Sequence, residues 1–267
     1  MSRKESKIWL GIMALVLLLT GPGPGVIGYA RAETVKVAVS ISIPPFFIKE
    51  IDSGIEMEII RQAFKRGGHE VLPVFFRAGP RITSYQDGKV ACASTVTTES
   101  GLKGVYSDPV ITMETVAISL ASRGLTIQNI QDLSHLNIIA FKGAKNILGA
   151  QFVNAIQNNL HYRERLKNEI QPVLLYRKRV DVVLSDGMIF QYYRNKMAER
   201  VDVTQPITAH HIFPPQNFSL ICHDPLLIDA FNRGLAQIKA SGLYGRIHDR
   251  FTREIFDQRL ENREEPR

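Results

Sequence analysis

Short apolar segments with the length of β-strands alternate with helical segments along most of this 267-residue chain. Residues 35–40, 71–76 and 90–93 have the composition of strands, and apolar side chains at helical spacing between residues 57 and 64 predict a helix between the first two. A second alternation begins at residues 137–141. Strands that alternate with helices favour a parallel sheet covered by helices, so we predict an α/β fold.

The second half of the chain continues this architecture without repeating the sequence of the first half. We expect further strands at residues 116–121, 173–175, 181–184 and 218–222. We expect a helix at residues 82–86, one that follows residues 142–145 and runs to about residue 160, and further helices from residue 187, from residue 224 and at residues 243–251. We expect the charged tail after residue 251 to be disordered. Residues 163–167, in which Arg, Glu and Lys mix, have the pattern of a solvated helix face.

The N-terminus has the pattern of a secretory signal. Cationic side chains precede an apolar run at residues 8–19, and residues 30–32 (Ala-Arg-Ala) have the small-x-small pattern of a signal-peptidase site. The run is shorter than the ~20 apolar residues that a membrane-spanning helix needs. We therefore expect residues 1–32 to be a cleaved signal peptide, Glu33 to be the first mature residue, and the protein to reach the periplasm; an uncleaved N-terminal anchor is the alternative.

The charge of the chain argues against nucleic acid as a partner. The formal net charge is +7, part of which lies in the predicted signal, and the remaining Lys and Arg residues are scattered. A nucleic-acid-binding protein would carry a basic stripe with interleaved aromatic residues. We expect no nucleic-acid binding.

Two cysteines are present, Cys92 and Cys222, and both lie inside predicted strands. In an oxidising compartment they would form a disulfide if their strands are neighbours. Free thiols buried in the core are the alternative, because cysteine is among the most frequently buried residues.

Hydroxyl side chains gather directly after the predicted strand at residues 90–93. Thr95, Thr97, Thr98 and Ser100 lie where this strand opens into a loop. In open α/β sheets, ligands bind at the carboxyl ends of the strands. The same residues also occur as simple turn caps. The stretch is therefore a candidate ligand-binding loop.

Residues 87–109, which read DGKVACASTVTTESGLKGVYSDP, carry a resemblance to a known family. They resemble the first-lobe signature of the bacterial periplasmic solute-binding proteins of polar amino-acid ABC importers (family 3 extracellular solute-binding proteins), which reads G-K-V-D, T-x-T-P-E-R and V-D-F-S-x-P. The positions that fit are Thr95, Thr97, Glu99, Ser107 and Pro109. Further motifs of the family are matched in the same order at residues 43–46, 132–143, 179–186 and 224–251.

The resemblance implies a fold and a function. The fold would be two-lobed and periplasmic-binding-protein-like (type II), with crossing hinge strands, lobe 1 formed by residues 33–117 and 219–267 and lobe 2 by residues 118–218. The protein would be a monomer that captures a small polar ligand between its lobes and passes it to the permease of an ABC-type importer.

The resemblance also implies a ligand site. Asp186 matches the carboxylate that binds the ligand's ammonium group, and Thr95 matches a hydroxyl that holds the ligand's carboxylate. Ile43 replaces a stacking aromatic residue, and residues 144–145 replace a pair of small hydroxyl residues. The candidate ligand-binding residues are Ile43, Phe46, Ser94, Thr95, Thr97, Ser100, Gly143, Ala144, Lys145 and Asp186.

Ser100 departs from the family pattern, which has an arginine at this position. A ligand carboxylate without that bidentate guanidinium loses its strongest contact, so we expect a ligand other than a standard α-amino acid. Lys145, Arg77 or Arg81 could replace the arginine from another direction. Alternatively, all three are solvated surface cations.

Two other functions remain open, a ligand-sensing or accessory protein of the cell envelope and an enzyme on the same scaffold. Carboxylates lie near predicted strand ends at Glu56, Glu99, Asp108 and Asp186. However, the sequence has no nucleophile-elbow motif, phosphate-binding loop or H-E-x-x-H motif. Adjacent residues of a strand point to opposite faces, so His210 and His211 do not favour a shared metal. We expect no catalytic residue, metal or cofactor.

Overall fold

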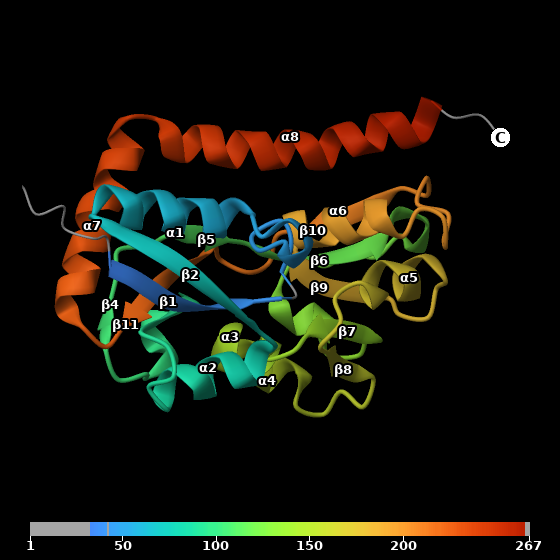
Figure 1. Cartoon of the computed structure of the whole chain (residues 1–267). Helices are drawn as coiled ribbons and strands as arrows, with labels where there is room; N and C mark the ends of the chain where they lie inside the picture. The colour runs from blue at the N-terminus through green and yellow to red at the C-terminus, as the bar shows by residue number, and fades with distance from the viewer. Residues whose placement is uncertain (1–32, 42, 265–267) are drawn as a thin grey trace, which may run out of the picture. The chain divides into compact units, whose positions relative to one another are not determined.

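The computed structural model describes residues 33–41 and 43–264 (Figure 1). The predicted signal peptide, residues 1–32, lies outside the described residues. The described chain contains two β-sheets with helices packed on both, in agreement with the predicted α/β class. No helix in this part of the chain is both long enough and apolar enough to cross a membrane.

The first sheet has the strand order β2-β1-β3-β11-β4, and β5 also pairs with β11. β1 is parallel to β2 and β3, whereas β11 is antiparallel to its partners. A disulfide joins Cys92 of β3 to Cys222 of β11, so the first of the two alternatives for these cysteines holds. The strands are β1 (Glu33–Ser40), β2 (His69–Phe76), β3 (Cys92–Val96), β4 (Val105–Tyr106), β5 (Ile111–Met113) and β11 (Gln216–Cys222).

The second sheet has the order β10-β6-β9-β7-β8. β7 is parallel to β8 and β9, while β6 is antiparallel to β9 and β10. The strands are β6 (Thr115–Leu120), β7 (Ile138–Phe141), β8 (Tyr162–Arg165), β9 (Val182–Asp186) and β10 (Ile207–His210).

Eight α-helices and four short 3-10 helices are assigned in the described residues. The α-helices are α1 (Ile55–Arg66), α2 (Ala78–Gln86), α3 (Ala144–Ile147), α4 (Gly149–Ile156), α5 (Ile170–Tyr176), α6 (Gly187–Lys196), α7 (Pro225–Ala240) and α8 (Leu243–Glu264). The 3-10 helices are η1 (Lys49–Ile51), η2 (Thr98–Ser100), η3 (Ala121–Arg123) and η4 (Ile130–Leu133).

The chain passes between the two sheets twice. The first crossing lies between β5 and β6, and the second between β10 and β11. This connectivity is that of the two-lobed, type II periplasmic-binding-protein-like fold with crossing hinge strands. The predicted lobe boundaries, residues 33–117 with 219–267 and residues 118–218, remain predictions.

Helix α1 packs closely against α7 on the first sheet. Its apolar stripe, which includes Met57, Ile60 and Phe64, is fully buried, as the helical spacing predicts. Gly234 of α7 permits the close approach, because a Cβ at this position would lie only 1.9 Å from the carbonyl oxygen of Ala63. Any larger residue at Gly234 would push the two helices apart.

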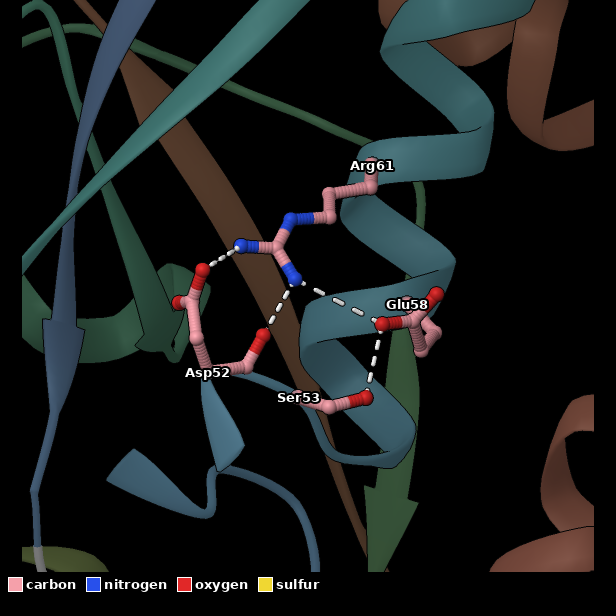
Figure 2. Close-up of polar contacts among 4 residues, drawn as sticks. All are labelled: Asp52, Ser53, Glu58 and Arg61. Carbon is pink, nitrogen blue, oxygen red and sulfur yellow. Dashed lines mark hydrogen bonds and ion pairs between the residues drawn. The ribbon is translucent and has the colours of Figure 1, made fainter. Parts of the chain in front are cut away.

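A polar network fixes the loop that leads into α1 (Figure 2). Arg61 donates to the Asp52 carboxylate at 2.5 Å and also to the Asp52 backbone carbonyl. The hydroxyl of Ser53 donates to Glu58 at 2.7 Å, and Arg61 lies 3.5 Å from the same Glu58 oxygen. These contacts hold the start of α1, and the same turn of the helix carries Glu56 toward the end of β3.

Two predictions in the second lobe are wrong. Residues 173–175 lie in helix α5 and not in a strand, since a short apolar run does not by itself distinguish a buried helix from a strand. Residues 163–165 belong to strand β8 and not to a helix. In β8, Tyr162 and Glu164 face inward with the two-residue period of a strand, and the alternating charges concealed that period.

The structure also moves two predicted boundaries. Strand β3 begins at Cys92 and runs to Val96, so that Ser94 and Thr95 belong to the strand rather than to the loop after it. The C-terminal helix, predicted to end at residue 251, continues to Glu264, where we had expected a disordered tail. One side of α8 is buried through Ile247, Phe251 and Ile255. Because this apolar stripe continues past residue 251, the helix does not end at the predicted position.

Candidate functional site

A cavity of about 280 Å³ is lined by residues from both sheets and from both crossings. Ser40, Ile43, Arg81 and Thr95 line it from the first sheet and its connections. The crossings contribute Met113, Thr115 and residues 213–216, and the second sheet and its helices contribute residues such as Phe141, Ile147, Ser185 and Asp186. Small-molecule sites lie preferentially at such junctions, so this cavity is the candidate ligand site.

The walls of the cavity are mainly apolar. The charged residues at its surface are Arg81, Lys142 and Asp186. The apolar lining residues are Ile43, Met113, Phe141, Ile147, Leu148, Leu166, Ile189, Phe213, Pro214, Pro215 and Phe218. An apolar lining with a few polar groups at defined positions is typical of small-molecule sites.

Thr95 is fixed by a buried carboxylate. Its backbone N–H and its hydroxyl donate to the two oxygens of Glu56, at 2.9 and 2.8 Å. Glu56 is fully buried in α1, and burial raises the pKa of its carboxyl from 4.5 to about 7, against the opposing effects of Thr95 and Arg81. The Thr95 hydroxyl that the family resemblance assigns to the ligand is thus already bonded to Glu56.

Arg81 extends from α2 to the end of β3. Its two Nη atoms donate to the backbone carbonyls of Ser94 and Thr95, the latter at 3.3 Å. Its Nε is buried and has no hydrogen-bond partner among the described residues. Burial lowers the pKa of Arg81 to about 10, so the guanidinium is still charged at neutral pH. Arg81 is therefore a positively charged group at the cavity surface with donor capacity left.

Asp186 lies at the carboxyl end of β9 and caps α6. Its Oδ1 accepts from the backbone N–H groups of Met188 and Ile189, at 2.9 and 3.1 Å, and its Oδ2 accepts from Glu114 N–H at 3.3 Å. Burial raises the pKa of this carboxyl above its ordinary value, against the effect of these donors. The geometry of Asp186 allows two roles, that of a helix cap and that of an acceptor that faces the cavity.

Glu164 of β8 accepts from backbone N–H groups at the start of α3. It accepts from Gly143 N–H at 2.9 Å and from Lys145 N–H at 3.2 Å. Although burial alone would raise its pKa, these donors and Tyr162 hold the pKa of Glu164 below its ordinary value. Lys145 itself points elsewhere, with Nζ 5.3 Å from the centre of the Tyr162 ring. An internal carboxylate therefore fills the position at which the resemblance implies contacts with a ligand.

The structure brings three of the predicted site residues to the cavity surface: Ile43, Thr95 and Asp186. The others lie behind it or away from it. Phe46 is buried in the core of the first sheet and Ala144 in that of the second sheet. Ser94 is buried, and its hydroxyl donates a hydrogen bond to the backbone carbonyl of Ala38. Ser100 is exposed and bonded to the Tyr106 hydroxyl at 2.9 Å. Thr97, Gly143 and Lys145 do not line the cavity.

Several lining residues were not predicted as site residues. Among the three cations named as possible replacements for the missing arginine, only Arg81 lines the cavity, and Arg77 is exposed. The second crossing supplies Phe213, Pro214, Pro215 and Gln216. The Pro-Pro pair directly before a predicted strand was a usable signal for this segment, since it resembles the pair at residues 44–45.

The two adjacent histidines have separate partners. His210 lies at the end of β10 with Nε2 3.0 Å from the Ser119 hydroxyl, and His211 Nδ1 lies 2.6 Å from a Glu114 oxygen. Among the described residues, no group of three or more His, Cys, Asp or Glu side chains is arranged to hold a metal ion.

Comparison with solved structures finds the same fold in proteins of low sequence identity. The arginine-, lysine-, histidine-binding protein ArtJ from Geobacillus stearothermophilus has a TM-score of 0.66 and 17% identity, covering 82% of this chain and 95% of that one. A histidine kinase sensor domain with similarity to periplasmic binding proteins has a TM-score of 0.69 and 15% identity, covering 83% and 96%.

A third similar structure is the ancestral amino acid-binding protein AncCDT-1, a precursor of cyclohexadienyl dehydratase, with a TM-score of 0.65 and 20% identity, covering 82% of this chain and 95% of that one.

A search of curated proteins found no match. Residues 35–254 match the bacterial extracellular solute-binding proteins, family 3. This match spans the two sheets and both crossings, and the chain therefore belongs to that family.

Proposed function

We propose that this protein captures a small molecule in the cavity and delivers it to an ABC-type importer in the membrane. The observation that carries the proposal is the lining of the cavity by residues from both sheets and both crossings. A ligand at this position contacts both lobes and favours the state in which they are closed around it. A membrane partner that recognises the closed state would receive the loaded protein selectively.

We further propose that the ligand is not a standard α-amino acid. Two features support this. Ser100, at the position of the family's arginine, is exposed and bonded to Tyr106, and the backbone donors of Gly143 and Lys145 are occupied by Glu164. The carboxylate of an α-amino acid would find neither a guanidinium at position 100 nor these backbone donors of the second lobe.

Native mass spectrometry of protein purified without denaturation tests the capture of a ligand. We expect a bound small molecule, or stabilisation by at least one compound in a thermal-shift screen of metabolites. A bare mass together with no stabilising compound would contradict the proposal. A strong rise in melting temperature with any of the twenty amino acids would contradict only the exclusion of α-amino acids.

A sensing or accessory role is the second candidate, and the similarity to a histidine kinase sensor domain favours it. The two roles differ in the membrane partner that recognises the closed, ligand-bound protein. Crosslinking in intact cells followed by identification of the membrane partner distinguishes them: a permease supports import, whereas a receptor supports sensing. We propose a binding role without chemistry in both cases, and turnover of a bound metabolite by the purified protein would contradict it.

We propose that the mature protein is a periplasmic monomer that begins at Glu33, after cleavage of residues 1–32. The membership of an extracellular family supports secretion. N-terminal sequencing of protein from the envelope fraction tests the cleavage site, and retention of Trp9 in the mature chain would contradict it.

A further inference from the structure

Arg81 lines the cavity, and its guanidinium has donors without an assigned acceptor among the described residues. Two of its five N–H groups are assigned to the backbone carbonyls of Ser94 and Thr95, while the buried Nε has no partner among the described residues. A buried charged donor without an acceptor costs free energy that an incoming acceptor recovers. Charge-assisted hydrogen bonds from arginine are strongest to planar anions such as carboxylates.

The charge of Arg81 also lacks a full counter-charge in the protein. Among the described residues, Arg81 forms no ion pair, that is, no carboxylate oxygen lies within 4.0 Å of its side-chain nitrogen atoms. Glu56 is the nearby acid, but its two oxygens accept from Thr95, and burial raises its pKa to about 7. Near pH 7, Glu56 is about half ionised and compensates the charge of Arg81 only in part, so this end of the cavity favours an anion.

The rest of the cavity does not offer a matching strong site for an ammonium group. Among the described residues that line the cavity, Asp186 is the only acidic one, and three backbone N–H groups already donate to it. These donors and the start of α6 compensate its charge, so a ligand cation gains less from it than from a free carboxylate. Most of the remaining surface is apolar, including Ile43, Phe141, Ile147 and Phe213.

We propose that the cavity takes a small hydrophobic carboxylate, with its anionic group at the guanidinium of Arg81 and its apolar body against the aliphatic and aromatic walls, and without an ammonium group. The inference rests on the ligand-binding function proposed above and names the class of ligand. The volume of about 280 Å³ is at the lower end of ligand pockets, which span roughly 300–1,000 Å³, and accommodates a body such as one aromatic ring or a branched aliphatic chain.

The chemical test uses ligands that differ in charge and not in shape. The set consists of phenylacetate, 3-phenylpropionate and 4-methylpentanoate, each with its primary amide, its amine analogue and the amino acid of closest shape. We expect at least one acid to bind at least tenfold more tightly than its amide in calorimetry, and the amine to give no detectable heat. An amide or amino acid that binds as tightly as the matching acid would overturn the inference, and so would failure of all three acids.

The genetic test uses Arg81→Gln, with Arg77→Gln as a matched control. Arg77 lies four residues before Arg81, is exposed and does not line the cavity. We expect Arg81→Gln to reduce the preference for the acid over its amide at least tenfold, and Arg77→Gln to leave this ratio unchanged. The ratio reports on charge recognition even if Arg81→Gln lowers affinity in general, and Arg81→Lys should retain part of the preference.

The outcomes also separate this inference from the function on which it rests. If native mass spectrometry identifies a sugar, an amine or a zwitterionic amino acid as the ligand and Arg81→Gln binds it normally, the ligand class is wrong but capture of a small molecule stands. If no compound binds at all, the proposed function itself fails.

Discussion

Glu56 and Thr95 are joined by two hydrogen bonds that use both oxygens of the carboxylate, at 2.9 Å from the Thr95 N–H and 2.8 Å from its hydroxyl. The pair links α1 to the end of β3. Thr95 has a φ of 54°, in a region that β-branched residues rarely adopt. The carboxylate therefore fixes the backbone of Thr95 at the position where it meets both Arg81 and the cavity.

This pair predicts a pH-dependent stability. The pKa of Glu56 is about 7 in the folded protein and 4.5 as its ordinary value, so the folded state retains a proton that the unfolded state loses. The free energy of unfolding should therefore fall as the pH rises from about 4.5 to about 7, and then level off. The shift corresponds to roughly 3 kcal/mol as an upper bound. Urea unfolding at pH 4.5 and pH 8 measures it.

Glu56→Gln is the control for this prediction, because its amide oxygen can accept the Thr95 N–H while its NH₂ group donates to the hydroxyl. The variant keeps the other titrating groups, including His210, whose lowered pKa acts in the opposite direction. We expect the stability of Glu56→Gln relative to the unmodified protein to rise between the two pH values. A parallel pH dependence in both proteins would show that Glu56 does not titrate in this range.

The disulfide between Cys92 and Cys222 predicts a large contribution to stability. It joins facing residues of β3 and β11 across 130 positions of sequence, and both side chains are buried. Removing a native disulfide costs about 2–5 kcal/mol. We expect the double variant Cys92→Ala with Cys222→Ala to lose stability by this amount in urea unfolding, with ligand affinity retained because neither residue lines the cavity.

Reduced, unmodified protein is the comparison for the double variant. Full reduction should bring its unfolding midpoint close to that of the variant. An unfolding curve that is unchanged by complete reduction would contradict a stabilising role for this bond.

The elements that the sequence predicts well are those with long, one-sided apolar patterns. β1, α1 and β2 follow the predicted ranges closely. Val35, Val37 and Val39 of β1 and the apolar stripe of α1 are buried in one core, and β2 packs Val71 and Phe75 against it. β8 was not predicted, because its inward-facing side chains are polar and a mixed run of charges has no apolar period. Glu164 accepts from the backbone of Gly143 and Lys145 and from the hydroxyl of Tyr162.

The candidate site was only partly predictable for a similar reason. Thr95 and Asp186 follow from the rule that ligands bind at the carboxyl ends of strands, and both line the cavity. The occupation of Gly143 and Lys145 by Glu164, and the direction of Arg81, depend on how distant segments pack. The sequence alone does not show whether a carboxylate of the ligand or a carboxylate of the protein accepts hydrogen bonds from a set of backbone N–H groups.

The two roles of Asp186 predict different effects of substitution. As the cap of α6, its removal in Asp186→Ala should lower the free energy of unfolding by about 1 kcal/mol, and Asp186→Asn should retain most of the stability because the amide oxygen also caps. As the partner of a ligand ammonium group, its removal would weaken binding by roughly 2–5 kcal/mol in both variants.

With a hydrophobic carboxylate as ligand, we expect Asp186→Asn to bind as tightly as the unmodified protein or more tightly, because the substitution removes a negative charge from the cavity surface. Calorimetry with the best-binding acid measures this change. A large loss of affinity in Asp186→Asn at unchanged stability would instead identify Asp186 as the partner of a positive ligand group.

Ser100 carries the last prediction, because its family counterpart is an arginine and its own side chain is exposed. Ser100→Arg removes one exposed hydrogen bond, to Tyr106, so its effect on stability should lie within about 0.5 kcal/mol. The new guanidinium should create measurable affinity for α-amino acids and weaken binding of the hydrophobic acid, by contact with that ligand or by filling the space that it needs. Thr98→Arg, in the same exposed turn, is the matched control and should change neither affinity. A thermal-shift panel of the twenty amino acids on all three proteins makes the comparison. If Thr98→Arg gains amino-acid binding equally, the effect is one of general surface charge, and the position of Ser100 does not decide ligand preference.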